Sequence, residues 1–207
     1  MSYRDGSIEM RDRRRCFLPR LRGWLSPADI PRGADLIFVL AGRVDRKDYA
    51  LELFRQGLSP RILFSVGGFE IRRFSQMPLP VPLDLLKLAQ ETPPPQRHYF
   101  AFFQRQNVQL ELVLPGRFGT LREIEALAGW LRAHPDIRSV SVISSETHLR
   151  RIRMCCRSLL NPNLELAYLA APFTPPEPEL RFALANTMDL LLELFKVSIY
   201  WALLKIR

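Results

Sequence analysis

The sequence predicts an α/β protein, a Rossmann-like doubly wound and mostly parallel sheet with helices on both faces. Several short segments are apolar without interruption, which is typical of strands buried on both sides in a parallel sheet. Most of these segments are followed by a stretch with apolar residues at helical spacing. This alternation of strand and helix along the chain indicates right-handed crossovers that cover both faces of one sheet.

The elements are expected in the following order. The first strand is predicted over residues 34–41, and the helix after it ends at Gly57, because glycine commonly terminates helices. The predicted strands are 34–41, 61–65, 110–114, 140–144 and 164–169. The predicted helices are 46–56, 120–134, 147–160 and 180–206, with short helices near 83–90 and 97–106.

The chain of 207 residues is expected to form a single domain. Residues 1–33 are rich in arginine and are predicted to be an irregular basic segment that packs through Phe17, Leu21 and Trp24. The domain proper spans 34–207. Within it, the proline-rich stretch 70–107 is predicted to be an insertion that resembles a lid.

The net charge of +9 comes almost entirely from arginine. Codon usage in a GC-rich genome explains such a bias, and attraction to phosphates, nucleic acid or an anionic membrane surface is the functional alternative. The adjacent residues Cys155 and Cys156 are poorly placed for a disulfide on a helix. No second cysteine pair completes a zinc site and the histidines are scattered, so no metal site is predicted.

No secretory signal and no apolar stretch of membrane-spanning length is recognised, which predicts a cytoplasmic location. Peripheral attachment to the inner membrane is kept as an addition to that prediction. Nucleic-acid binding is the least favoured interpretation, because the basic residues lack interleaved aromatic residues on a strand face.

Ligands of open α/β sheets bind outside the carboxyl ends of the strands, so the residues that follow the strands are the site candidates. Small residues there allow close approach of a ligand, while helix N-termini and arginines attract anions. His148 is the candidate acid or base, because its usual pKa lies near neutrality. The predicted ligand-binding residues are Gly42, Arg46, Ser65, Gly67, Gly68, Arg117, Thr120, Glu123, Ser144, Ser145 and Arg151.

Several of these residues also have a purely structural interpretation. Gly67 and Gly68 are typical of a turn, and Thr120 and Glu123 have the spacing of a helix capping box. His148 is equally well explained as a first-turn helix residue without a ligand. No phosphate-binding loop, dinucleotide fingerprint or nucleophile elbow occurs, so no cofactor is assigned.

The segment Ser144–Arg151, with its Ser-x-x-x-His-x-x-Arg pattern, and the segment Ile62–Gly68 resemble the bacterial YdcF/SanA/ElyC-like domain family. The resemblance covers about residues 34–170. It implies a Rossmann-like fold, a pocket for a nucleotide or phosphate group, and a role in envelope or surface-polysaccharide metabolism.

The C-terminal helix carries one polar stripe, Asp189, Glu193, Lys196 and Tyr200, on an otherwise apolar segment. One interpretation is a core helix that covers a sheet face, and the other is a helix that binds a membrane surface or a partner.

Two functions therefore stay open. Either the chain binds an anionic metabolite, with or without transforming it, or it is a non-catalytic module at a membrane or in a complex. The sequence fixes neither the substrate nor the reaction, and leaves open whether the protein is an enzyme.

Overall fold

The computed structural model describes residues 19–104, 107–112, 119–172 and 179–206, with only the backbone described for residues 179–186. The predicted site residue Arg117 and the arginines of residues 11–15 lie outside these ranges.

The described strands form one six-stranded sheet in the order β4-β3-β2-β1-β5-β6. Strands β2, β1, β5 and β6 are parallel, while β3 and β4 form an antiparallel hairpin that extends the sheet beside β2. The mostly parallel α/β fold predicted from the sequence is confirmed. The strands are β1 Leu36–Val39, β2 Arg61–Gly67, β3 His98–Gln104, β4 Asn107–Leu112, β5 Ser139–Ser145 and β6 Glu165–Ala171.

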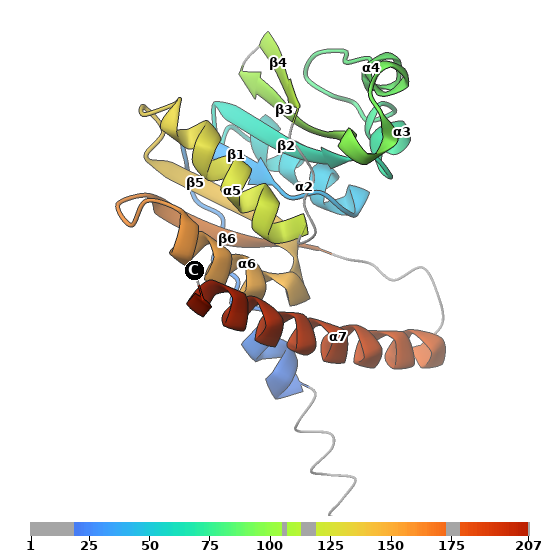
Figure 1. The fold of residues 1–207 in the computed structure, drawn as a ribbon, viewed down its shortest axis with the longest axis vertical. Helices are drawn as coiled ribbons and strands as arrows, with labels where there is room; N and C mark the ends of the chain where they lie inside the picture. Colours follow the sequence, from blue (N-terminus) through green and yellow to red (C-terminus); the bar gives the residue numbers. More distant parts are fainter. Residues whose placement is uncertain (1–18, 105–106, 113–118, 173–178, 207) are drawn as a thin grey trace, which may run out of the picture.

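Helices cover both faces of the sheet (Figure 1). Helices α2, α3 and α4 pack on one face, and α5 and α6 pack on the other. The helical elements are α2 Val44–Arg55, α3 Ile71–Phe74, α4 Leu85–Glu91, α5 Gly119–Arg132, α6 Leu149–Leu159 and α7 Glu179–Ile206, with short 3-10 turns η1 Pro94–Gln96 and η2 Glu146–His148.

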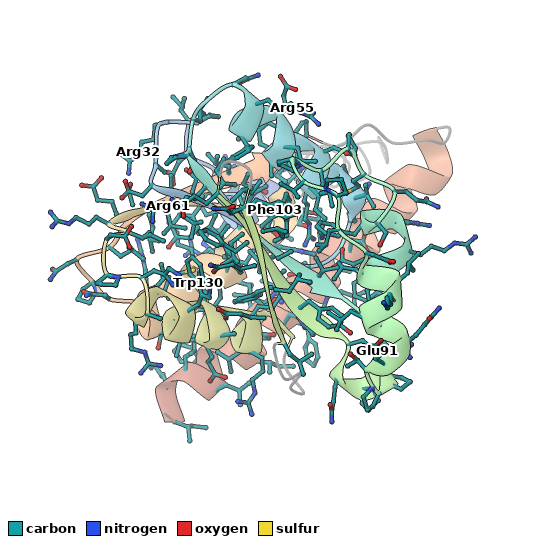
Figure 2. The ribbon with its side chains drawn as sticks, turned by 90° about the horizontal axis from the view of Figure 1, so that it is seen from above. Arg32, Arg55, Arg61, Glu91, Phe103 and Trp130 are labelled. Carbon is teal, nitrogen blue, oxygen red and sulfur yellow. The ribbon has the colours of Figure 1, made fainter. Side chains whose placement is uncertain are left out.

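Strand β1 is apolar throughout because it is buried on both sides. Leu36 and Phe38 point into the core under α5 and α6, whereas Ile37 and Val39 point into the core under α2. Figure 2 shows the side chains on the ribbon, with Trp130 on α5 and Phe103 on β3 labelled. Trp130 of α5 packs edge-on against a phenylalanine of β3, which ties that strand into the first core.

The helix predicted near 97–106 is wrong, because this segment forms strand β3. Its aromatic residues favour a strand, and they alternate between the two cores: Phe100 and Phe102 lie in one, Tyr99 and Phe103 in the other. The strand predicted over 110–114 is the end of an exposed edge strand, β4. Residues 113–114 lie outside the described ranges. The proline-rich stretch is therefore in part a member of the main sheet.

The basic N-terminal segment is not wholly irregular, since residues 19–25 are helical. Leu25 is fully buried and packs with Leu190 and Val197 of α7, with Leu21 against the same cluster. Trp24, predicted to pack, is 43% exposed, and Phe17 lies outside the described residues.

Helix α7 packs on α6 and η2 rather than on the sheet, so it forms a third layer (Figure 1). Its predicted role as a direct cover of a sheet face is wrong. Among the described residues, no helix combines the length and the apolar character needed to span a bilayer.

The antiparallel hairpin brings the start of β3 to the edge of the sheet where β2 ends. Because β3 runs opposite to β2, His98 at its start pairs with Gly67 at the end of β2. The first residue of β3 therefore lies at the edge where the parallel strands end.

Candidate functional site

A cavity of about 880 Å³ opens at the carboxyl ends of the parallel strands. Predicted site residues that line it are Gly42, Arg46, Gly67, Gly68, Thr120, Glu123, Ser144, His148 and Arg151. The sequence analysis missed other lining residues, namely Phe69, Arg97, His98, Lys196 and Tyr200. The two remaining described candidates, Ser65 and Ser145, support the lining through hydrogen bonds.

Arg46 lies in the first turn of α2 and is almost completely buried. Its Nε donates to Ser145 Oγ at 2.9 Å, and its Nη1 donates to the carbonyl oxygen of Ala41 at 2.6 Å. Its Nη2 lies 2.8 Å from Nδ1 of His148. Burial lowers the pKa of Arg46 while nearby carboxylates, Glu123 first, raise it. The guanidinium is thus a fixed positive charge whose donors serve the protein itself.

Gly42 makes this placement of Arg46 possible. It has a φ of 134°, a conformation that L side chains rarely adopt. A Cβ atom at this position would lie 2.7 Å from Nη1 of Arg46. Gly42 is predicted to allow close approach of a ligand, but in the structure it allows close approach of the Arg46 side chain instead.

His148 is held as a neutral imidazole. Because a guanidinium nitrogen can only donate, Nδ1 accepts from Arg46, and the proton then sits on Nε2, 3.3 Å from Oε1 of Glu193. Burial first, and then the charges of Arg46 and Arg151, lower the pKa of His148 against the opposing effect of Glu193, and the resulting pKa is about 3. Both ring nitrogens are engaged, so the geometry favours a positioning role over proton transfer.

Glu193 of α7 joins three cationic or polar groups beneath the cavity. Its Oε2 accepts from Nε of Arg151 at 3.1 Å, and its Oε1 accepts from Nζ of Lys196 at 2.8 Å. Arg151 also donates from Nη1 to Oγ1 of Thr120 at 2.5 Å. Burial raises the pKa of Glu193, while the charges of Arg151 and Lys196 lower it, and the pKa lies below its usual value. The polar stripe on α7 was the sequence signal for this residue.

Glu123, Ser65 and His98 form a second buried group. Ser65 Oγ lies 2.5 Å from Oε1 of Glu123 and 2.6 Å from Nε2 of His98. The same carboxylate oxygen accepts the backbone N–H of Ala41 at 2.8 Å. Burial raises the pKa of Glu123 and lowers that of His98. Ser65 does not line the cavity, and its hydroxyl already contacts Glu123 and His98, so it supports Glu123 rather than facing a ligand.

The capping box predicted for Thr120 and Glu123 is therefore wrong. The Thr120 hydroxyl accepts from Arg151, and the Glu123 carboxylate reaches the end of β1 instead of its own helix start. Tertiary partners outcompete the local hydrogen bonds that the spacing suggested.

Glu70 and Lys47 form a buried ion pair that the sequence analysis missed. The Glu70 carboxylate accepts Nζ of Lys47 at 2.6 Å, the backbone N–H of Gly67 at 2.7 Å and that of Gly42 at 3.1 Å. The backbone donors predicted to bind a ligand anion thus hold an anion from the chain itself. Burial lowers the pKa of Lys47, and Glu70 opposes that shift.

Three groups still face an incoming ligand. Arg97 uses its Nε on the carbonyl oxygen of Thr92 at 2.9 Å, and Lys196 has a half-exposed side chain. The hydroxyl of Ser144 is completely buried at the cavity wall and has no hydrogen-bond partner among the described residues. Since a buried hydroxyl without a partner is costly, it marks a place for a ligand or water.

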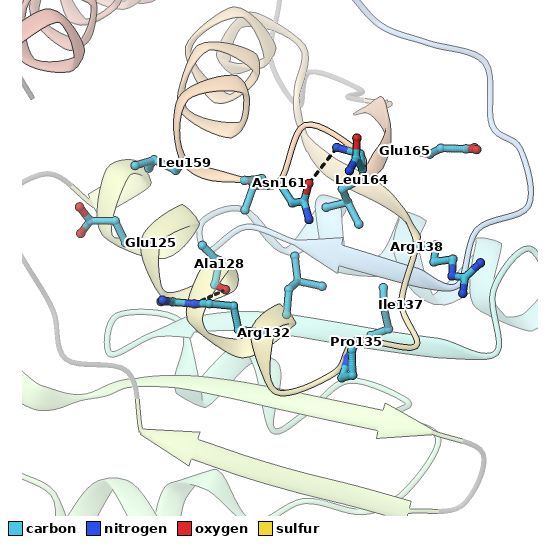
Figure 3. A pocket seen from close by; sticks show the side chains of 13 residues that line it. Glu125, Ala128, Arg132, Pro135, Ile137, Arg138, Leu159, Asn161, Leu164 and Glu165 are labelled. Carbon is cyan, nitrogen blue, oxygen red and sulfur yellow. Dashed lines mark hydrogen bonds between the residues drawn. The ribbon is translucent and has the colours of Figure 1, made fainter.

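A second cavity, of about 990 Å³, lies at the opposite edge of the sheet, between the ends of α5 and α6 (Figure 3). Apolar residues such as Ala128 and Leu164 form much of its wall, and Arg132 and Arg138 lie around it. None of the predicted site residues lines this cavity. Over the described part of the chain, no group of three or more His, Cys, Asp or Glu side chains could hold a metal ion.

Comparisons with known proteins add no relative: no family model matches the chain, and no curated protein or solved structure matches it significantly.

Proposed function

We propose that this protein binds an anionic small molecule, of phosphate or nucleotide type, in the cavity at the carboxyl ends of the strands. The observation that carries the proposal is the unpartnered Ser144 hydroxyl in a wall with excess positive charge. Within the described residues, the cavity and the layer beneath it hold five cationic side chains and three carboxylates: Arg46, Lys47, Arg97, Arg151 and Lys196 against Glu70, Glu123 and Glu193.

The charged groups divide into a fixed set and an approachable set. Arg46 and Arg151 are buried, and every guanidinium nitrogen of each contacts a group of the protein, so they contribute a fixed positive charge at the site. Arg97 and Lys196 are the cations that a ligand meets first. Donors fixed in place before binding lose little freedom when a ligand arrives, which favours affinity.

The proposal concerns binding and leaves the reaction open. His148 was the candidate acid or base, and its two ring nitrogens already serve Arg46 and Glu193. The resemblance to the YdcF/SanA/ElyC-like family adds the expectation of a role in envelope or surface-polysaccharide metabolism. A cytoplasmic location is part of the proposal, and the free thiols of Cys155 and Cys156 support it.

Calorimetric titration with inorganic phosphate and pyrophosphate tests the proposal. We expect Arg97→Ala and Lys196→Ala each to weaken pyrophosphate binding about tenfold, the effect of losing one charge-assisted contact. Arg132→Ala and Arg138→Ala are matched controls, because they remove cations from the other cavity. No saturable binding, or equal losses in the control variants, would overturn the proposal.

Ser144→Ala provides a sharper readout because its two effects have opposite signs. Removing a buried hydroxyl that lacks a partner should leave the free protein as stable as before or more stable. The same change should weaken pyrophosphate binding, since the ligand loses a donor. An unchanged affinity in this variant would show that the hydroxyl plays no part in binding.

A further inference from the structure

Helix α7 exposes a long apolar stripe on the side that faces away from the protein. Phe195 is 63% exposed and Ile206 is 86% exposed. The exposed apolar residues Met188, Leu191, Leu192, Phe195 and Ile206 recur every three or four residues or a multiple of that spacing, so they share one face. Leu190 and Val197, on the opposite face, are buried.

This helix departs from the pattern of an ordinary surface helix. Two residues of its polar stripe, Glu193 and Tyr200, are buried beside the cavity, while several large apolar residues point outward. A surface helix normally turns apolar residues inward and charges outward. An extended apolar surface left on the outside is typical of an interaction site.

Exposed tryptophans with cations over their rings lie on α7 and on the N-terminal helix that packs against it. Lys205 lies over the ring of Trp201, with Nζ 4.0 Å from its centroid. Arg150 of the neighbouring α6 lies over Trp24 at 4.2 Å. Both tryptophans are about half exposed. Indole rings next to cations suit the boundary between lipid headgroups and acyl chains, where one side is apolar and the other is wet.

The basic N-terminal segment is attached beside the same helix. Leu25 packs on Leu190 and Val197, which fixes residues 19–25 against α7. Residues 1–26 contain seven arginines and three acidic residues, and four of these arginines lie within residues 11–15. The chain therefore connects an arginine-rich stretch directly to a helix that packs on α7.

We propose that this face of α7, with the adjoining basic segment, docks the protein on the surface of an anionic lipid bilayer. Apolar side chains that enter the interface and a basic segment that attracts anionic headgroups are together the two signals that stable peripheral binding needs. A second copy of the chain would also bury the stripe. Its basic segment carries the same charge, however, and would not neutralise the first one. This inference goes beyond ligand binding and does not depend on it.

Vesicle flotation of the full chain tests the inference, with vesicles of phosphatidylcholine alone or with 30% phosphatidylglycerol. We expect binding to the anionic vesicles that weakens as salt is raised from about 0.05 to 0.5 M, because salt screens charge attraction. Leu191→Ser with Phe195→Ser should reduce this binding at least tenfold. Ile30→Ser with Leu86→Ser, which also removes two exposed apolar side chains, is the matched control.

Two results would overturn the inference. One is an absence of flotation with anionic vesicles at low salt, or equal losses in the control variant. The other is a dimer in light scattering that dissociates in the Leu191→Ser, Phe195→Ser variant while flotation is unaffected, which would assign the stripe to a second copy. Circular dichroism confirms that each variant is folded before it is compared.

Discussion

The two cavities at opposite edges of the sheet are similar in size and differ in how deeply the charged side chains near them are buried. Their volumes are about 880 Å³ at the carboxyl edge and about 990 Å³ at the amino edge. At the carboxyl edge, Arg46, Glu123 and Glu193 are almost completely buried. At the amino edge, Asp136, which pairs with Arg61, is 62% exposed. Buried charge is costly, so its concentration at one edge distinguishes a candidate site better than volume does.

The amino edge shows what a carboxylate does in a structural role. Asp35 precedes β1, and its Oδ2 accepts the backbone N–H groups of Arg138 and Ser139 and the Ser139 hydroxyl, each at 2.9 Å. Burial raises the pKa of Asp35, but these hydrogen bonds outweigh it and lower the pKa overall. The carboxylate fastens β1 to the start of β5 through these hydrogen bonds, and its cationic neighbour Arg61 is only partly buried.

The largest expected effect comes from breaking the buried pair at the carboxyl edge. Glu70→Ala should reduce the free energy of unfolding by about 3–5 kcal/mol, because it leaves Lys47 buried without a counter-charge and two backbone N–H groups unpaired. Urea denaturation measures the loss. Asp136→Asn, which weakens an exposed pair at the amino edge, should leave the denaturation midpoint unchanged.

A double variant separates charge from packing in the same experiment. Lys47→Met with Glu70→Gln should recover much of the stability lost in Glu70→Ala, because no unpaired charge stays buried. If the double variant were as unstable as the single one, the ion pair would not be the source of the effect.

A smaller loss of stability is expected when either of two glycines with positive φ is replaced by alanine, and its size should differ between the two positions. Gly42→Ala at the carboxyl edge should cost about 2–3 kcal/mol, because the new Cβ meets Nη1 of Arg46 at 2.7 Å. Gly57→Ala, between α2 and β2 at the amino edge, should cost only about 1 kcal/mol, since its Cβ would meet nothing within 4 Å. Thermal unfolding of the two variants checks the difference, and equal losses would contradict the proposed fit of Arg46 under Gly42.

The smallest expected effect is a dependence of stability on pH through His148. Its pKa is about 3 in the folded chain, against 6.5 in the unfolded chain. As the pH falls below about 6.5, the unfolded chain therefore binds a proton that the folded chain does not, and stability is lost. We expect a loss of about 0.7 kcal/mol from this group between pH 7 and pH 6.

His148→Asn should remove that part of the pH dependence, as measured by urea denaturation at both pH values. Nitrogen chemical shifts of the imidazole should show a neutral ring with its proton on Nε2 at pH 5. A protonated ring at that pH would contradict the geometry, in which Arg46 donates to Nδ1.

Much of the carboxyl edge was predictable, because residues after buried strands must meet there once the strands are parallel. That rule correctly brought Arg46, His148 and Thr120 to one cavity. It failed for His98, which starts an antiparallel strand that the proline-rich sequence concealed. It also failed for Glu70 and Glu193, whose roles depend on which distant cation they meet, and neither strand order nor helical spacing specifies that choice.

Because Glu193 belongs to α7, the last helix is an integral part of the cavity and cannot be treated as an appendage. A truncation ahead of it would remove the carboxylate that Arg151 and Nε2 of His148 contact. The same helix turns one side toward the candidate ligand and the other toward the surroundings. A shift of α7 along its axis would therefore move Glu193 relative to its contacts with Arg151 and His148.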